Sequence, residues 1–170
     1  FVINSLDRKK QQAYLEKLSY RDMLTGLYNR NRYIERLEAY KQVQDQQIGA
    51  IYIDLNGLKK VNDEQGHRAG DELIVRAAGT IAGIFAEDAY RVGGDEFVVI
   101  LLDVSREEFA RKTEQLRRQM QENSVDASIG EVWQASTENL EDLLRRADEN
   151  MYREKKRYYS QADAARKPES

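Results

Sequence analysis

The sequence predicts an α+β fold of the ferredoxin-like (βαββαβ) type, a sheet containing antiparallel strands flanked by helices, preceded by an N-terminal linker helix. Three observations lead to this prediction. From Ile48 onward, stretches with strand and helix periodicity alternate in the order β-α-β-β-α-β, followed by α. Gly93 and Gly94 separate two apolar runs, which indicates a tight hairpin. The length, 170 residues, suits one domain plus an appendage.

The first half of the domain is predicted to form a helix, a strand and a second helix. Asn29–Gln44 repeats apolar residues at helical spacing, from Tyr33 to Tyr40. Ile48–Leu55 is a short run rich in isoleucine, long enough for a buried strand. Gly70–Phe85 has an apolar residue at every third or fourth position, which is typical of an amphipathic helix.

The second half begins with the predicted hairpin. Its two strands are expected at Ala89–Val92 and Phe97–Leu102. A helix over Ser105–Gln121 opens with a capping box, in which Glu108 follows the capping serine by three residues. The last predicted elements are a strand at Val125–Val132 and a helix at Leu140–Tyr158.

The chain divides into a linker helix (residues 1–20), a domain (21–159) and a tail (160–170). Phe1–Ser19 is polar with a thin apolar stripe of Ile3, Leu6, Ala13 and Leu18, so it either connects to an upstream module or is a solvated arm. Because the first residue is not Met, we expect a fragment of a longer protein. Ser160–Ser170 is small, polar and aperiodic, and is expected to be disordered.

The composition excludes several classes of function. Without cysteine there is no disulfide, thiolate metal site or cysteine nucleophile, which fits the reducing cytoplasm. A formal net charge of −3 argues against a DNA- or RNA-coating surface. The mean hydropathy of −0.78 and the absence of a long apolar run exclude a membrane span within these residues. No membrane contact is expected from this stretch, whereas an anchor upstream of it stays open.

The predicted topology brings distant acidic residues together. The first two strands run parallel through a right-handed crossover, and the third lies between them, antiparallel to both. The end of the first strand then lies beside the start of the third. Asp54 is therefore expected to approach Asp95 and Glu96 at one edge of the sheet.

Carboxylates held together in this way repel one another unless a cation or a shared proton offsets their charge. Oxygen ligands alone favour Mg²⁺ or Mn²⁺, and the single histidine, His67, could not build a zinc site. A ferredoxin-like sheet with two aspartates at its edge resembles the palm of polymerases and nucleotide cyclases. The pattern alone nevertheless favours a simpler alternative, in which Asp54 ends a strand and Asp95 lies in a turn.

Five sequence motifs, in family order, reverse that preference. They are Asp22–Arg30, Tyr52–Asp63 with Gly66–Asp71 after it, Arg91 with Gly93–Phe97 (the letters GGDEF), Ser128–Gly130, and Ala147–Lys155. With these motifs the chain resembles the GGDEF family of diguanylate cyclases from about Asp22 to about Tyr158.

The resemblance implies roles for the acidic edge. Asp54 and Asp95 would hold two Mg²⁺ (or Mn²⁺) ions per active site, with the backbone carbonyl of Leu55 as an additional ligand. Glu96 would be either a further ligand or the proton acceptor for the attacking 3′-hydroxyl group, and the sequence does not decide between them.

The resemblance also implies contacts to the nucleotide. Asn62 and Asp71 would read the guanine edge, although alone the first is a turn former and the second favours a helix N-terminus. Asp71 favours GTP over ATP, since some relatives that accept ATP and make mixed dinucleotides carry a small residue there. Leu24, Leu58 and Ile74 would line the base pocket, with plain core residues as the alternative.

Further residues match the family's phosphate region. Lys59 and Lys155 would contact the triphosphate, although cations near a helix end also suit the helix dipole. Gly93 and Gly94 would turn the hairpin and let the nucleotide approach the backbone, or form the turn only. Arg91 would bridge to the nucleotide region or to a dimer partner, or be a solvated strand end.

Two positions depart from the family pattern. Relatives often carry a second cation four residues after the position of Lys155, where this chain has Tyr159, so contacts to the γ-phosphate are less well supported than metal binding. Many relatives bind their product at an Arg-x-x-Asp site upstream of GGDEF. The matching positions hold Ile84 and Glu87. We therefore expect product inhibition through this site to be absent.

The function implied is that of a diguanylate cyclase, a nucleotidyltransferase of bacterial signalling that condenses two GTP into cyclic di-GMP and two pyrophosphates. The product is twofold symmetric, so a homodimer would be needed, aligned through Phe1–Ser19 by an upstream sensory domain. One alternative is a catalytically silent GGDEF domain acting as a GTP-binding regulatory module, against which the intact GGDEF letters count. A cyclase making a mixed or adenine product is another, against which Asp71 counts.

Overall fold

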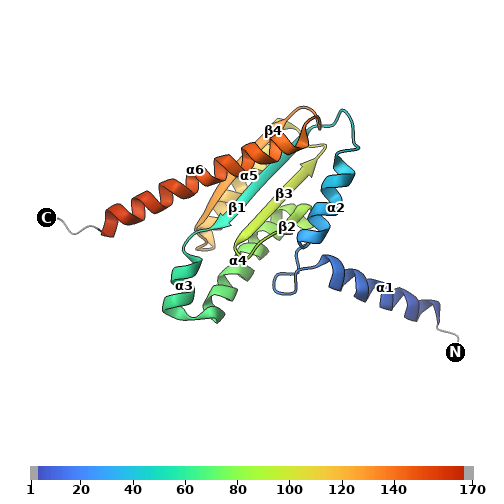
Figure 1. Cartoon of the computed structure of the whole chain (residues 1–170), viewed down its shortest axis with the longest axis horizontal. Coiled ribbons are helices and arrows are strands. Elements are labelled where there is room, and N and C mark those ends of the chain that lie inside the picture. Colours follow the sequence, from blue (N-terminus) through green and yellow to red (C-terminus); the bar gives the residue numbers. More distant parts are fainter. Residues whose placement is uncertain (1–3, 167–170) are drawn as a thin grey trace.

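A computed structural model describes residues 4–166, in which helices cover both faces of a four-stranded sheet (Figure 1). The elements in chain order are α1 (Ser5–Tyr20), α2 (Arg30–Tyr40), β1 (Ile48–Leu55), α3 (Leu58–Gln65), α4 (His67–Phe85), the short 3-10 helix η1 (Ala86–Asp88), β2 (Ala89–Arg91), β3 (Glu96–Leu102), α5 (Arg106–Glu122), β4 (Ala127–Gln134) and α6 (Leu140–Arg166). From β1 onward the predicted succession is present, with two short helices, α3 and η1, added.

The sheet has the strand order β2-β3-β1-β4. Strand β3 pairs antiparallel with both β1 and β2, and β4 pairs antiparallel with β1. Strands β1 and β2 therefore run parallel on either side of β3, as the crossover argument predicted. The α+β, ferredoxin-like prediction is confirmed.

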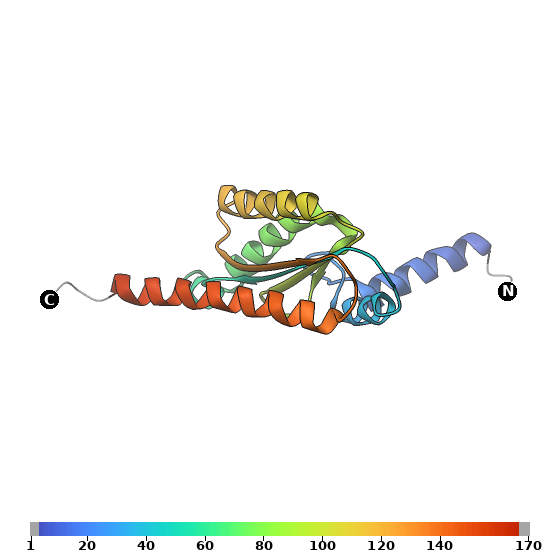
Figure 2. The ribbon, with the colours of Figure 1, turned by 90° about the horizontal axis from the view of Figure 1, so that it is seen from above.

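Alternate residues of the central strand β1 belong to two hydrophobic cores. Ile51 and Ile53 pack with residues of α4 and α5, whereas Ile48 and Ala50 pack with residues of α2 and α6. Figure 2 shows these two layers of helices on opposite sides of the sheet. Because Asp54 follows the alternation of Ile48 and Ala50, its side chain belongs to the face covered by α6.

Helix α3 was not predicted. It follows Gly57, whose φ is 72°, and ends before Gly66, whose φ is 89°, so glycines bound it at both ends. Its eight residues include none that is buried, and a helix this short and polar gives no clear apolar periodicity.

The disordered tail predicted from Ser160 is wrong for residues 160–166, because α6 continues to Arg166. The segment Ser160–Arg166 is rich in alanine and contains neither glycine nor proline, so local propensity supports the helix. The rest of the predicted tail, residues 167–170, lies outside the described residues.

Helix α1 forms as predicted but buries none of its residues. Leu6, Leu15 and Leu18 are 57%, 60% and 48% exposed, and Figure 1 shows the helix projecting away from the sheet. Ile3 of the predicted stripe lies outside the described residues. Over residues 4–166, no helix combines the length and apolar character that a membrane crossing requires.

Candidate active site

The predicted convergence of carboxylates is found where β1 ends. Asp54 pairs with Glu96 in the β1–β3 register, and the Leu55 N–H donates to the Asp95 carbonyl oxygen at 3.0 Å. Carboxylate oxygens of Asp54, Asp95 and Glu96 lie within 4.8 Å of one another. Asp54 is buried, Asp95 is half-buried and Glu96 is exposed, so the cluster rises from the core to the surface.

Lys155 of α6 reaches the buried end of this cluster. Its ammonium donates to Asp54 Oδ1 at 2.7 Å and to the Leu55 carbonyl oxygen at 3.0 Å. The side chains of Lys155 and Asp54 are only 17% and 10% exposed. A residue predicted to contact phosphate therefore forms an ion pair with a residue predicted to bind metal.

The protonation of Asp54 reflects these surroundings. Burial raises the pKa of its carboxyl group to about 6; the hydrogen bond from Lys155 opposes this rise, and the negative charge of Asp95 adds to it. A cation bound at the cluster lowers the free energy of the ionised form, so the electrostatics of this place favour positive charge.

The turn that carries the GGDEF letters is held by hydrogen bonds from the Arg91 side chain. Arg91 donates to Asp22 Oδ2 at 3.0 Å and to the Gly94 carbonyl oxygen at 2.8 Å. Arg91 was expected to bridge to the nucleotide region or a partner, or to be a solvated strand end. With a side chain only 15% exposed it is not solvated; its charge is used within the domain to hold the turn.

The two glycines of this turn differ in their surroundings. Neither Gly93 nor Gly94 has a positive φ, so the turn does not depend on left-handed backbone at these positions. A Cβ on Gly93 would press on the Glu96 side chain at 3.0 Å, whereas one on Gly94 would meet no atom within 4 Å. The close approach of a nucleotide to this backbone stays a prediction.

The two predicted guanine contacts are brought together by the hairpin of α3 and α4. Asn62 of α3 packs so closely on Gly70 of α4 that a Cβ there would overlap the Asn62 side chain. Asp71, the next residue of α4, is exposed. The structure thus brings Asn62 of α3 against Gly70, the residue that precedes Asp71 in α4.

The remaining predicted residues are distributed around this end of the domain. Lys59 is exposed in the first turn of α3. Ile74 is buried in the core, and Leu58 packs against that core while partly exposed. Leu24 is 38% exposed in the α1–α2 connection. For Ile74 the core alternative therefore applies, and a role in a base pocket stays a prediction for all three apolar residues.

Asn56 belongs to the site although the sequence argument gave it no role. Its amide donates to the Asp126 carboxylate at 2.9 Å, and its Oδ1 accepts from the Ser128 hydroxyl at 2.9 Å and lies 3.5 Å from Lys155 Nζ. Its place directly after the predicted metal ligands was the available signal. Its partners are 70 and 72 residues away in the sequence, so only the fold reveals the network.

The two family departures also have structural counterparts. The Lys155 ammonium lies 5.7 Å from the ring centre of Tyr159, which stands where relatives often have a cation. Glu87 forms an ion pair with Arg21 at 2.8 Å, and Ile84 packs against the core. The absence of product inhibition at these positions stays a prediction.

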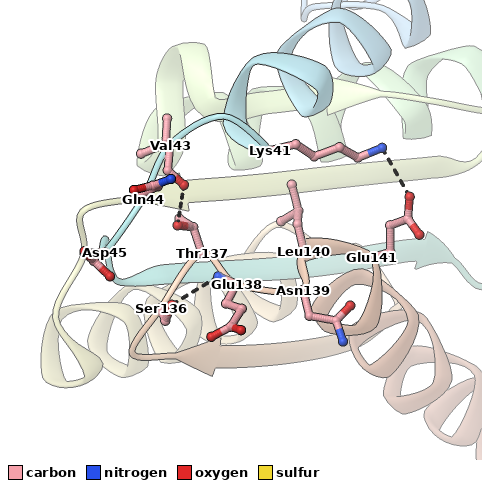
Figure 3. A pocket seen from close by; sticks show the side chains of 10 residues that line it. All are labelled: Lys41, Val43, Gln44, Asp45, Ser136, Thr137, Glu138, Asn139, Leu140 and Glu141. Carbon is pink, nitrogen blue, oxygen red and sulfur yellow. Dashed lines mark hydrogen bonds and ion pairs between the residues drawn. The ribbon is translucent and has the colours of Figure 1, made fainter.

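A cavity of about 510 Å³ lies elsewhere (Figure 3). It is lined by residues of the α2–β1 and β4–α6 connections, near the start of β1. A hydrogen bond joins the two connections there, in which the Thr137 hydroxyl donates to the Val43 carbonyl oxygen at 2.6 Å. The acidic cluster is at the other end of β1, about 20 Å away along the strand. None of the predicted site residues lines this cavity.

The donor set at the acidic edge fits a hard divalent cation. It consists of carboxylate oxygens and a backbone carbonyl oxygen, the ligands that Mg²⁺ and Mn²⁺ prefer. That an ammonium group already binds Asp54 and the Leu55 carbonyl shows that these oxygens can serve a cation. The cluster could therefore hold a metal ion.

Comparison with known proteins agrees with this geometry. The family described as "Diguanylate cyclase, GGDEF domain" matches residues 19–161. The chain is 30% identical over 161 residues to diguanylate cyclase VdcA of Vibrio cholerae, covering 86% of this chain and 47% of VdcA. It is 33% identical over 147 residues to diguanylate cyclase DgcS of Shewanella oneidensis, covering 79% of this chain and 49% of DgcS.

A solved structure shows the same fold. The coiled coil and GGDEF domain of DgcB from Caulobacter crescentus, in complex with c-di-GMP, matches with a TM-score of 0.77 at 23% identity, covering 89% of this chain and 90% of that one. The chain spans less than half the length of VdcA and of DgcS. From the family match over most of its length, the convergent acidic edge and the shared fold, the chain belongs to the GGDEF family of diguanylate cyclases.

Proposed function

We propose that this domain is a catalytically active diguanylate cyclase that condenses two GTP into cyclic di-GMP and two pyrophosphates. The observation that carries the proposal is the acidic cluster of Asp54, Asp95 and Glu96, formed by an intact GGDEF turn against the end of β1. A structural role alone does not require three carboxylates within 4.8 Å of one another.

In this proposal Asp54, Asp95 and the Leu55 carbonyl oxygen hold two Mg²⁺ or Mn²⁺ ions per active site. Bound there, such ions lower the pKa of the attacking 3′-hydroxyl group and stabilise the leaving pyrophosphate. Glu96, exposed at the rim of the cluster, either adds a ligand or accepts the hydroxyl proton. At each step a 3′-O–P bond forms and the bond to pyrophosphate breaks, and two such steps close the ring.

The chain's other residues bind and orient GTP. Asn62 and Asp71, neighbours on the α3–α4 hairpin, are proposed to accept and donate hydrogen bonds along the guanine edge. Lys59 and Lys155 offer positive charge to the triphosphate. The open space beside Gly94 offers room for the phosphates, since even an added Cβ would meet no atom within 4 Å there.

A twofold-symmetric product requires two such domains facing each other, so we propose a homodimer for catalysis. Helix α1 supports this, because Leu6, Leu15 and Leu18 stay exposed on it and none of its residues is buried. The relative DgcB carries a coiled coil beside its GGDEF domain. An upstream sensory domain would align the two domains of the dimer through α1. We propose that the reaction takes place in the cytoplasm, where GTP is supplied.

The proposal is tested by incubating the protein with GTP, ATP and Mg²⁺ and identifying the product by mass. Cyclic di-GMP is expected, with no product from Asp95→Ala or Glu96→Ala. GTP binding without turnover, even when the protein is artificially dimerised, would contradict the enzymatic proposal and favour the silent regulatory module. An adenine-containing product would contradict the proposed role of Asp71.

A further inference from the structure

The contacts of Lys155 are the feature that the proposed function leaves unexplained. Its side chain is only 17% exposed, so its ammonium does not face open solvent. It donates instead to Asp54 Oδ1 at 2.7 Å and to the Leu55 carbonyl oxygen at 3.0 Å. These are two of the oxygens to which the proposed function gives the metal, so one lysine and the metal need the same ligands.

We infer that Lys155 competes with the divalent cation in the nucleotide-free domain, and that a bound triphosphate relieves the competition by drawing Lys155 away. The inference rests on the proposed function, because it takes Asp54 and Leu55 as metal ligands and a nucleoside triphosphate as substrate.

The competition follows from geometry and charge. Mg²⁺ binds oxygen at about 2.0–2.1 Å, so it cannot share with an ammonium group the lone pairs that point at that group. Two positive centres around one carboxylate also repel each other, and burial strengthens the repulsion. Asp54 and Lys155 are 10% and 17% exposed, so water screens this pair poorly. An entering divalent cation therefore has to displace the Lys155 ammonium.

The backbone of Lys155 is fixed, which confines the displacement to its side chain. A Cβ on Gly130 of β4 would overlap the backbone of α6 at Ala147 and Met151, so helix and strand are in close contact just before Lys155. Asn56, held by its own hydrogen-bond network, approaches the ammonium at 3.5 Å. Rotation of the four-carbon stem is enough to move the charge from carboxylate to phosphate.

A thermodynamic consequence follows. If the triphosphate and Asp54 compete for Lys155, then nucleotide binding strengthens metal binding, and metal binding strengthens nucleotide binding by the same factor. Metal binding to the nucleotide-free domain is then weak, because Lys155 occupies two of the oxygens that the metal needs. Tyr159, one turn beyond Lys155, is neutral, so it adds no second cation near Asp54.

The test is a titration of nucleotide-free protein with Mn²⁺ at constant pH, in which the free ion is measured by electron paramagnetic resonance. Lys155→Met is expected to bind Mn²⁺ about tenfold more tightly than the wild type. Lys156→Met is the matched control, because it removes the same charge one residue later from an exposed side chain and should leave the affinity unchanged. Adding Asp54→Asn to Lys155→Met should abolish the gain.

Equal or weaker Mn²⁺ binding by Lys155→Met overturns the inference. If that variant does not fold, Lys155→Gln replaces it. In the wild type, Mg²⁺ should shift the ¹⁵Nζ resonance of Lys155, and an unchanged resonance at saturating Mg²⁺ also overturns the inference. Failure of the proposed function has a different signature, since the dimerised wild type would then make no cyclic di-GMP whatever the Mn²⁺ affinities are.

Discussion

At the scale of single residues, Arg91 anchors the turn that carries the GGDEF letters. Its guanidinium group joins Asp22, at the beginning of the domain, to the carbonyl oxygen of Gly94 within the turn. Asp95 and Glu96 follow directly. One cation therefore sets the position of two of the three clustered carboxylates, although it contacts neither carboxylate group in the described hydrogen bonds.

Replacing Arg91 should destabilise the fold. Arg91→Met leaves the Asp22 carboxylate and the Gly94 carbonyl without their donor, and we expect the free energy of unfolding to fall by about 2 kcal/mol in urea titrations at neutral pH. Arg68→Met is the control, since that side chain is 95% exposed and its removal should change stability by less than about 0.5 kcal/mol. Similar losses in both variants would contradict this role.

The same pair predicts a pH dependence. Burial alone would raise the pKa of Asp22, but hydrogen bonds from Thr25 and Arg91 lower it below the ordinary value of 3.8. Asp22 therefore stabilises the fold above that pH, and its contribution is lost as the pH falls through the lower pKa of the folded state. The stability difference between wild type and Arg91→Met should shrink from pH 7 to about pH 3. A constant difference would be evidence against the pair.

Product binding is predicted to be weak around Ile84–Asp88. Glu87 is paired with Arg21, and Ile84 packs against the core, so neither offers the charges of an Arg-x-x-Asp site. Isothermal titration with cyclic di-GMP should give no tight binding that depends on these residues. Tight binding of several ligands, lost on Glu87→Ala, is the outcome that would disprove this prediction.

At the scale of elements, the α3–α4 hairpin forms the proposed base-reading corner. Gly66 reverses the chain with a φ of 89°, and Gly70 allows α4 to pack directly on Asn62. At Gly66 the turn uses the backbone freedom of glycine, and at Gly70 the close packing uses its missing side chain. The separation of Asn62 from Asp71 is thereby set by backbone packing.

Gly70→Ala tests this corner. The added methyl group would displace the Asn62 side chain, so the affinity for GTP should fall about tenfold, the scale of one lost hydrogen bond to a base. Gly79→Ala is the matched control on α4, because a Cβ there meets no atom within 4 Å. That control should keep its GTP affinity and gain up to about 1 kcal/mol of stability from helix propensity. Unchanged GTP binding by Gly70→Ala would refute the role of Asn62.

At the scale of the whole molecule, the proposed catalysis requires a second copy of the domain. Among the described residues a single domain presents one acidic cluster, and the projecting α1 buries none of its residues. Fusing a parallel dimeric coiled coil in register with α1 should raise cyclic di-GMP formation by at least about tenfold at low protein concentration. Without the fusion, the rate per protein should increase with concentration. A rate per protein independent of both would argue against the homodimer.

The local signals of the sequence were strong enough to predict most elements. The extents of β1 and the capping of α5 by Ser105 follow from short-range patterns, and both are found in the structure. The sequence does not predict α3, because its eight residues contain only two apolar side chains, Leu58 and Val61, which are too few to establish a period. The predicted end of α6 at Tyr158 is too early, because helix propensity continues beyond the last apolar position.

The sequence by itself determined the family, the fold class and the meeting of Asp54 with Asp95 and Glu96, because periodicity, motif order and the handedness of crossovers are local or topological constraints. Only the tertiary structure decided the partners of these residues. Lys155 binds Asp54 from 101 residues away, and Arg91 binds Asp22 from 69 residues away. Such pairs depend on how helices and turns pack against the sheet. The periodicity of one segment does not predict that packing, because it reflects only residues close together in the sequence.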